Sequence, residues 1–431
     1  MVYHLLSIGV LAGLAIFNYR HARRNVLYPP FLFCMIWVSV LSLYFLLYLV
    51  PIIHMSTLHV YTLFVVLAAS VVFSLGGMVI RRRYYVSPAV VLNDKKSIYK
   101  KILFFCCLGL LPFFFLEIRR LSALGGIDGF LASARVGLVE ELTNGRSAFG
   151  GTLTTIAPLL AIFLAFIFVI EVRDWREERV WIAVSVFIAI VFCVLTTGRA
   201  GFLKLLVGLA GIYLLKTGRF SAKDAWKLLR WPLLIFVLIF TTLVPLTKNI
   251  SNTDETLTEA IAQFSVGYAV LPLAGFDYVV DHIEEYKYTP NFTLRELTAI
   301  AGHLPGVSST PQEEPNDFLL VPLFTNVYTA ISRYYIDFGL SGTLMAMFVF
   351  GLGQTWLFWR AVRGDPFYVF LFAITLYPLG MIAFDDTYTL FSHYFAELVF
   401  AIVYFRLLRM PVARGINGQS SGGLASTEVA Y

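Results

Sequence analysis

Ten basic residues of this sequence fall on the side of a membrane where positive charge is rare, if the apolar segments of the chain are its membrane spans. Three are Lys204, Lys248 and Lys287, and seven are arginines: Arg119, Arg120, Arg135, Arg146, Arg199, Arg295 and Arg333. Arginine is costly near a membrane core and is kept there mainly for partners or function. Its planar guanidinium pairs rigidly with phosphate and carboxylate oxygens. The group therefore favours an anionic, lipid-linked ligand. The simpler alternative is local ion pairing, as between Glu117 and Arg120, which lie one helical turn apart.

Arg199 is the most informative of these arginines. It lies in the segment TTGRAG at 196–201, between two apolar runs. Gly198 and Gly201 allow a tight turn and a close approach of ligand to backbone. The backbone N–H groups that begin the next helix would face an anion, with Lys204 near the same mouth. An ordinary hairpin turn between two helices explains the same residues without a ligand.

A second segment, NVYTAISRYYIDFGLSG at 326–342, leads from a long polar stretch into an apolar run. Arg333 and Asp337 are four residues apart, so they share one helix face. Pairing within the membrane explains them as well as a role in binding does. Gly339 and Gly342 permit close helix contact.

Histidines and carboxylates are the candidate proton acceptors. His303, in the sequence AGHLPG, is suited to act as a general base near neutral pH, although a histidine in a loop is more often simply solvated. Asp277 and Asp337 are the alternatives. His393 and Glu397 lie four residues apart in the last apolar run, and we expect them to satisfy each other inside the bundle.

The elements that position these residues follow from composition. Only 14% of the 431 residues are charged, and 58% are hydrophobic, whereas a soluble domain carries roughly 25% charged residues. The apolar runs are long enough to cross about 30 Å of hydrocarbon, where only helices satisfy every backbone group in such segments. We expect an all-α, polytopic transmembrane bundle with about 11 spans, at 3–19, 30–50, 58–80, 101–118, 151–170, 180–197, 201–215, 231–247, 334–359, 366–384 and 388–408.

Charge predicts the orientation of the bundle. All but ten of the 33 Lys and Arg residues fall on one side, which the positive-inside rule assigns to the cytoplasm. The N-terminus is then outside and the C-terminus cytoplasmic. We expect one membrane domain over 1–414 and a disordered tail over 415–431, rich in Gly and Ser. Two long outer loops, at 119–150 and 248–333, are of the kind that often carries function. The apolar stretch 261–280 in the second loop reads best as a helix in the outer interface or capping the bundle, and less well as another span.

Several classes of protein find no support. The sequence has no phosphate-binding loop of the ATPase type, no HExxH zinc motif and no GxSxG serine-hydrolase motif. It holds no large basic, soluble region for nucleic acid. The four cysteines lie inside apolar runs without metal-ligand spacing, which argues against both a disulfide framework and a zinc site.

The chain resembles the bacterial O-antigen polymerases, also called oligosaccharide repeat unit polymerases. The resemblance covers most of the chain as topology and is sharper at TTGRAG and at NVYTAISRYYIDFGLSG. The spacing from Arg295 to Gly306 fits an arginine–glycine pattern in the outer loops of some members. The other loop departs from that pattern, because the residue that follows Arg135 after ten intervening residues is Arg146 and not glycine.

The resemblance implies a glycosyltransferase of the bacterial inner membrane. A growing glycan, linked through diphosphate to undecaprenol, would pass to the next lipid-linked repeat unit at the outer leaflet. No metal or other cofactor is implied. The diphosphate would be held by Arg135, Arg146, Arg199, Arg295 and Arg333. Catalysis would involve Arg199, His303 and Asp337. A chain-length regulator and a flippase are expected partners of such an enzyme.

Two other functions stay open. An O-antigen ligase would use the same donor with a different acceptor. A flippase or transporter of lipid-linked sugars would use the arginines as a path, although most of the apolar runs lack charge in their middle.

Overall fold

The computed structural model is helical apart from one two-residue ladder. It describes residues 1–50, 55–80, 96–126, 148–172, 174–196, 199–228, 257–286, 327–388 and 391–408, with the short pieces 130–131, 133–134, 136–137, 230, 234, 293, 319–320 and 324–325. The long helices are α1 (Val2–His21), α2 (Pro29–Leu49), α3 (Val60–Val79), α4 (Lys96–Gly125), α6 (Ala148–Ile170), α7 (Trp175–Leu195), α8 (Arg199–Thr217), α10 (Leu257–Asp281), α13 (Ala330–Val362), α14 (Pro366–Met381) and α15 (Phe391–Ile402). Smaller elements are α11 (Ile283–Tyr286), the π-helical turn η2 (Val403–Leu407), β1 (Leu319–Leu320) and β2 (Phe324–Thr325). The two strands pair antiparallel.

Among the described residues, eight helices are long and apolar enough to cross a membrane: α1, α2, α3, α4, α6, α7, α8 and α13. Each coincides with a predicted span. The predicted spans at 366–384 and 388–408 correspond to α14 and to α15 with η2. The predicted span at 231–247 lies outside the described residues except for Leu234. The chain is thus a helical, multi-pass membrane protein by the length and composition of its helices.

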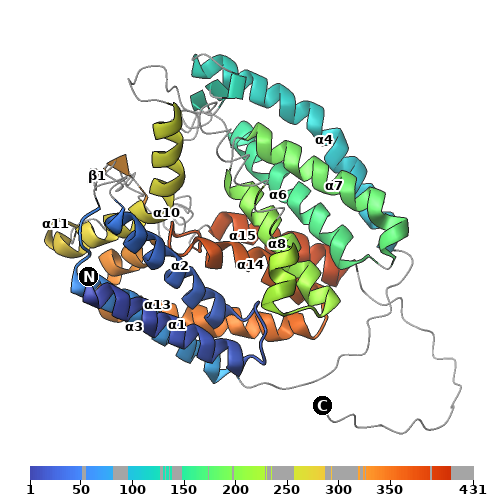
Figure 1. The fold of residues 1–431 in the computed structure, drawn as a ribbon. Coiled ribbons are helices and arrows are strands. Elements are labelled where there is room, and N and C mark those ends of the chain that lie inside the picture. The colour runs from blue at the N-terminus through green and yellow to red at the C-terminus, as the bar shows by residue number, and fades with distance from the viewer. Residues whose placement is uncertain are drawn as a thin grey trace, which may run out of the picture.

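The helices form two groups joined by α14 (Figure 1). The first group contains α1, α2, α3 and α13. The second contains α4, α6, α7 and α8. Helix α14 packs against α13 of the first group and against α6 and α8 of the second. Where α14 meets α6, the rings of Phe163 and Phe370 pack edge to face with centroids 4.9 Å apart. The joint between the groups is therefore a buried aromatic contact.

Small residues bring α3 and α13 into backbone contact. A Cβ atom at Gly351 would collide with the backbone carbonyl of Phe73, and one at Gly76 would collide with that of Phe348. Close approach through small residues is a usual way for membrane helices to associate, because burial of apolar surface gives no driving force in lipid.

Gly339 divides α13 into two pieces. Its φ of 62° and ψ of −167° are not helical, and this region of backbone space is essentially reserved for glycine. The short first piece, which holds Arg333 and Asp337, therefore takes a different direction from the long apolar piece. The side chain of Phe338 explains a second glycine, because a Cβ atom at Gly342 would collide with the Cβ atom of Phe338.

Contacts identify the two ends of the bundle. At one end the start of α3 meets α10, where His59 Nδ1 lies 3.1 Å from Asp277 Oδ2. We call this the acidic end, because the exposed Asp281, Glu284 and Glu285 lie there. At the other end the N–H group of Val26, after α1, donates to the carbonyl of Phe220, after α8. We call this the basic end.

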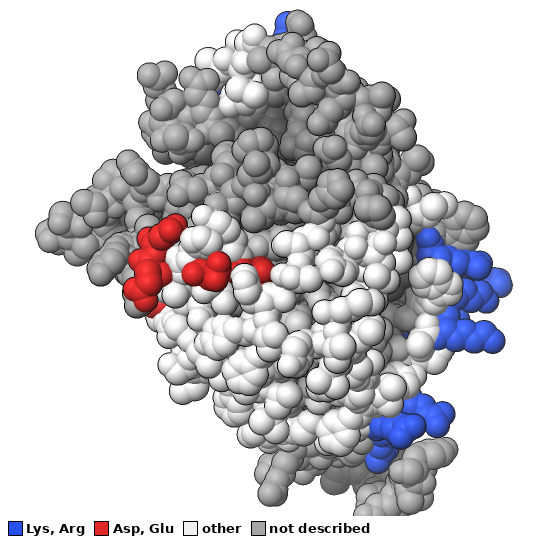
Figure 2. Space-filling model, turned by 60° about the vertical axis from the view of Figure 1, so that its left-hand side comes forward, with Lys and Arg blue, Asp and Glu red and all other residues white. Residues whose placement is uncertain are grey.

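Exposed basic side chains gather at the basic end, beside the end of α1. They include Arg20, Arg23 and Arg24. Figure 2 shows acidic and basic side chains on well-separated parts of the surface. A predominantly uncharged belt lies between them, as a bilayer requires.

The apolar stretch 261–280 is helical, as part of α10. Its second half packs against α2, α3 and α13, with Val270, Leu273 and Phe276 buried. Docking on the start of α3 fits a helix that caps the acidic end.

Candidate functional site

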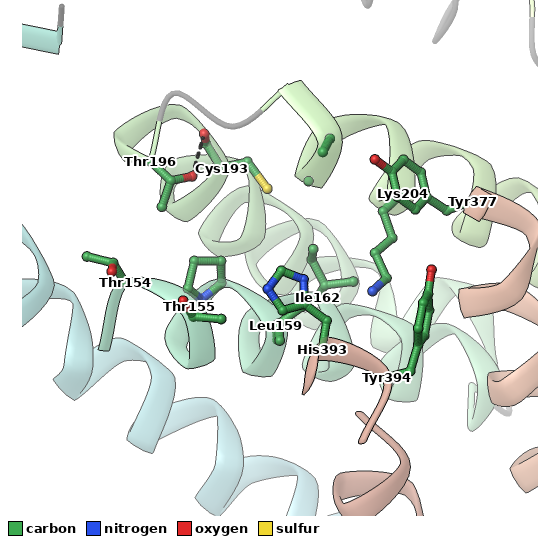
Figure 3. Close-up of a pocket in the computed structure, with 13 residues that line it drawn as sticks. Thr154, Thr155, Leu159, Ile162, Cys193, Thr196, Lys204, Tyr377, His393 and Tyr394 are labelled. Carbon is green, nitrogen blue, oxygen red and sulfur yellow. Dashed lines mark hydrogen bonds between the residues drawn. The ribbon is translucent and has the colours of Figure 1, made fainter. Parts of the chain in front are cut away.

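A cavity of about 210 Å³ lies beside the TTGRAG turn. Five helices meet around it: α6, α7, α8, α14 and α15. Its lining consists of Thr154, Thr155, Pro158, Leu159, Ile162, Cys193, Thr196, Ala200, Gly201, Lys204, Tyr377, His393 and Tyr394. Most of this surface is apolar, with hydroxyl groups and two basic side chains set into it (Figure 3).

The cavity lies in the half of the bundle towards the acidic end. Helix α8 starts at Arg199 beside the cavity and finishes at the basic end, where Lys216 Nζ donates to the carbonyl of Ile170 at 3.0 Å. Helix α14 finishes next to the start of α13, where the N–H group of Ala330 donates to the carbonyl of Ile382. The lining residues of α7, α8, α14 and α15 accordingly lie in the half of each helix nearer the acidic end, and those of α6 lie around its middle.

Of the TTGRAG segment, the structure describes Thr196 and residues 199–201. The Thr196 hydroxyl donates to the carbonyls of Phe192 and Cys193, both at 3.1 Å, and so closes the last turn of α7. A Cβ atom at Gly201 would lie 2.8 Å from Cys193 Sγ. The turn itself, at Thr197 and Gly198, lies outside the described residues, and the close neighbour of Gly201 is the sulfur of Cys193 on α7. Arg199 begins α8, and only its backbone is described.

Lys204 and Glu397 form a buried ion pair at the edge of the cavity. Nζ lies 2.6 Å from Oε2, and the two side chains are 7% and 1% exposed. The ring of Tyr394 lies beside the ammonium group, 5.2 Å from Nζ to the ring centroid. The expectation that His393 and Glu397 satisfy each other is wrong, because Glu397 pairs with Lys204 from another helix. The positive charge of Lys204 is therefore balanced within the protein.

His393 lines the cavity from the beginning of α15. Its side chain is half-buried and is drawn among the other lining residues (Figure 3). A histidine in a cavity lined by hydroxyl groups is placed to exchange a proton with a bound molecule. Sequence reasoning treated His393 as structural, since spacing alone pointed to Glu397.

Arg333 takes part in a polar cluster at the acidic end. Its Nη2 lies 2.8 Å from Asp385 Oδ1, while the hydroxyl of Tyr334 donates to Asp386 Oδ1 at 3.1 Å. The Nε atom of Arg333 is buried, and within the described part of the chain no group forms a hydrogen bond with it. The sequence left pairing of Arg333 with Asp337 open as one of two alternatives, and the structure gives the two residues separate partners.

The carboxylates considered as bases are already engaged. Asp337 Oδ2 accepts from the N–H group of Thr293 at 2.8 Å and from its hydroxyl at 2.6 Å. Asp277 is buried and accepts from the backbone N–H and the ring of His59, which fixes α10 to the start of α3. Both arrangements hold elements together.

The remaining candidates divide into two sets. Arg120 pairs with Glu117, with Nε 3.0 Å from Oε2, which confirms the local ion pair. His303, Arg135, Arg146 and Arg295 lie outside the described residues, as do Lys248 and Lys287. The cavity itself was not predicted, because Thr154, Thr155 and Tyr377 carry no local signal of a site.

Comparisons of the chain with protein-family models, with curated proteins and with solved structures gave no match.

Proposed function

We propose that this protein is a polymerase of undecaprenyl-diphosphate-linked oligosaccharide repeat units, acting at the outer face of the bacterial inner membrane. It transfers the growing glycan from its lipid diphosphate to the next lipid-linked unit, as in O-antigen or a similar surface polysaccharide. The observation that carries the proposal is the cavity beside the TTGRAG turn. Its lining includes residues of the TTGRAG segment, which carries the family resemblance, together with His393 and the hydroxyl groups of Thr155 and Tyr377.

The side of the membrane follows from charge. The acidic end faces outwards in this proposal, because the arginines of the basic end would remain in the cytoplasm under the positive-inside rule. The cavity then lies in the outer half of the membrane, near the leaflet where a lipid-linked glycan would be found.

Positive charge supports departure of the lipid diphosphate. As the bond to the sugar breaks, negative charge grows on the phosphate oxygens and needs nearby donors. Arg199 begins α8, whose first backbone N–H groups favour an anion. Arg333 has a buried Nε with no hydrogen-bond partner among the described residues. Arg135, Arg146 and Arg295 complete the proposed binding set from the sequence, and His303 and Asp337 complete the proposed catalytic set.

The experiment is a gel of surface polysaccharide from a strain that lacks the gene. The strain is complemented with the wild type or with Arg199→Ala at matched protein levels in the membrane. We expect a single-repeat band without the gene, a ladder with the wild type and little ladder with Arg199→Ala. A complete ladder without the gene would refute the proposal. Polymer that is made but not attached to the cell would identify a ligase.

A further inference from the structure

We infer that the cavity beside the TTGRAG turn holds the sugar of the acceptor repeat unit and that His393 takes the proton from its attacking hydroxyl. This inference rests on the proposed function and assigns its acceptor side. The diphosphate of the donor is then bound outside the cavity, towards Arg199 and Arg333.

The charge of the cavity argues for a neutral ligand. Among the described lining residues Lys204 is the only Lys or Arg, and Glu397 balances its charge at 2.6 Å. A phosphate that bound Lys204 would have to draw it away from a carboxylate that is 1% exposed. A buried charge left without its partner is strongly unfavourable. The cavity is therefore poorly suited to a diphosphate.

The lining suits a sugar ring. Sugars present hydroxyl groups around their edge and C–H groups on their faces. The cavity offers hydroxyl groups from Thr155 and Tyr377 and apolar surface from Pro158, Leu159 and Ile162. Its volume of about 210 Å³ is below the roughly 300–1,000 Å³ of sites for drug-sized ligands. It fits about one sugar unit, with the rest of the oligosaccharide outside.

His393 is the described group best placed to accept a proton there. It lines the cavity and is half-buried. Histidine is also the side chain that most readily exchanges a proton near neutral pH.

The step balances without a further reactant. The acceptor oxygen forms a bond to the anomeric carbon of the donor glycan, and the bond from that carbon to the diphosphate oxygen breaks. The diphosphate leaves with the electron pair, and the hydroxyl proton passes to the imidazole of His393. The imidazolium then returns its proton to water.

Chemical rescue tests the inference in intact cells. The strain that lacks the gene is complemented with the wild type, His393→Ala, His393→Gln or Arg199→Ala, and each culture is grown with and without imidazole. His21→Ala, at the exposed end of α1, is the matched control for replacing a histidine. Immunoblots of the membrane fraction give the level of each protein, and gels give the ladder.

We expect His393→Ala to lose at least nine-tenths of the polymer and imidazole to restore a visible ladder, because the small base enters the space left by the side chain. His393→Gln fills that space and stays inactive with imidazole. Arg199→Ala also stays inactive, and His21→Ala gives a normal ladder. A normal ladder from His393→Ala, or a loss that imidazole does not reverse, would overturn the inference. If neither His393 variant is found in the membrane, His393 is needed for folding, and this result would also overturn the inference. A complete ladder in the strain without the gene would refute the proposed function itself.

Discussion

Lys204 on α8 and Glu397 on α15 form an ion pair across 193 residues of chain, with 2.6 Å between Nζ and Oε2. Both side chains are almost fully enclosed. Removing two ions from water is costly, so such a pair adds little net stability, but breaking it exposes the full cost of one buried charge.

The pair predicts a large stability difference between single and double variants. Glu397→Gln leaves the ammonium of Lys204 without its counter-charge, and we expect the free energy of unfolding to fall by about 3–5 kcal/mol. Lys204→Met combined with Glu397→Leu removes both charges and recovers most of that loss. Unfolding of the purified protein in detergent measures each value. Equal stability of the single and double variants would contradict the buried pair.

The contact between α3 and α13 predicts a position-specific effect of alanine. Gly351→Ala places a methyl group against the Phe73 carbonyl, and such overpacking costs about 1–3 kcal/mol. Gly353, on the same helix, has open space around its Cβ position. Gly353→Ala is therefore the control, and a gain of up to about 1 kcal/mol is expected from helix propensity. Unfolding of the purified protein in detergent gives the free energy of unfolding of each variant. Similar values for Gly351→Ala and Gly353→Ala would disprove the close approach of α3 and α13.

The break in α13 predicts that Gly339 tolerates no side chain. Gly339→Ala has open space around the methyl group but an unfavourable φ of 62°, so strain of about 1–3 kcal/mol is expected. Gly380→Ala, which also has open space and no positive φ, is the matched control. A lower melting temperature for Gly339→Ala alone supports the kink. Two unchanged melting temperatures would mean that the chain can straighten there at no cost.

The Arg333–Asp385 pair predicts a need for the guanidinium rather than for charge alone. Arg333→Lys keeps the charge but loses the planar fork that contacts Asp385. A hydrogen bond to a charged group is worth about 1.5–3 kcal/mol. If the transition state depends on the orientation of the Arg333 guanidinium, losing that bond lowers the amount of polymer by about 10- to 100-fold. Densitometry of the polysaccharide ladder at matched protein levels gives the loss. A wild-type ladder from Arg333→Lys would rule out a specific role for the guanidinium.

The proposed orientation predicts sided labelling. A cysteine introduced as Glu285→Cys, at the acidic end, should react with a membrane-impermeant maleimide in cells with a permeabilised outer membrane. Lys223→Cys, after α8 at the basic end, should react only after lysis. The wild type gives the background from its own four cysteines, which all lie in helices. The reverse pattern would invert the orientation.

The helices were largely predictable because hydropathy decides them. The predicted span 30–50 matches α2 within one residue at each end. The errors have physical causes. Helix α4 extends from 96 to 125, beyond the predicted 101–118, since a helix does not have to end where the hydrocarbon ends. The division of α13 at Gly339 was missed because glycines are common in membrane helices and spacing does not reveal φ.

The ion pairs were predictable only where they are local. Glu117 and Arg120 are three residues apart, and their pairing is confirmed. Lys204 and Glu397, and Arg333 and Asp385, belong to different helices, and one sequence gives no information on which helices are neighbours. For Glu397 the expected partner was His393, four residues away, and for Arg333 the sequence offered Asp337, also four residues away, as one alternative; packing supplied another partner in each case. The cavity was missed for the same reason, because its lining comes from five separate helices.

The short length of α14 has a consequence for water. Its 16 residues extend about 24 Å at 1.5 Å per residue, less than the roughly 30 Å of hydrocarbon. The connection that follows, with Asp385 and Asp386, therefore begins below the plane of the lipid head groups. Non-helical backbone at that depth persists only where protein encloses it or an aqueous space adjoins it. Protein encloses Asp386, which is buried, whereas the Asp385 side chain is 38% exposed, so we expect water to reach Asp385. Under the proposed function, that hydrated space would open towards the outer leaflet.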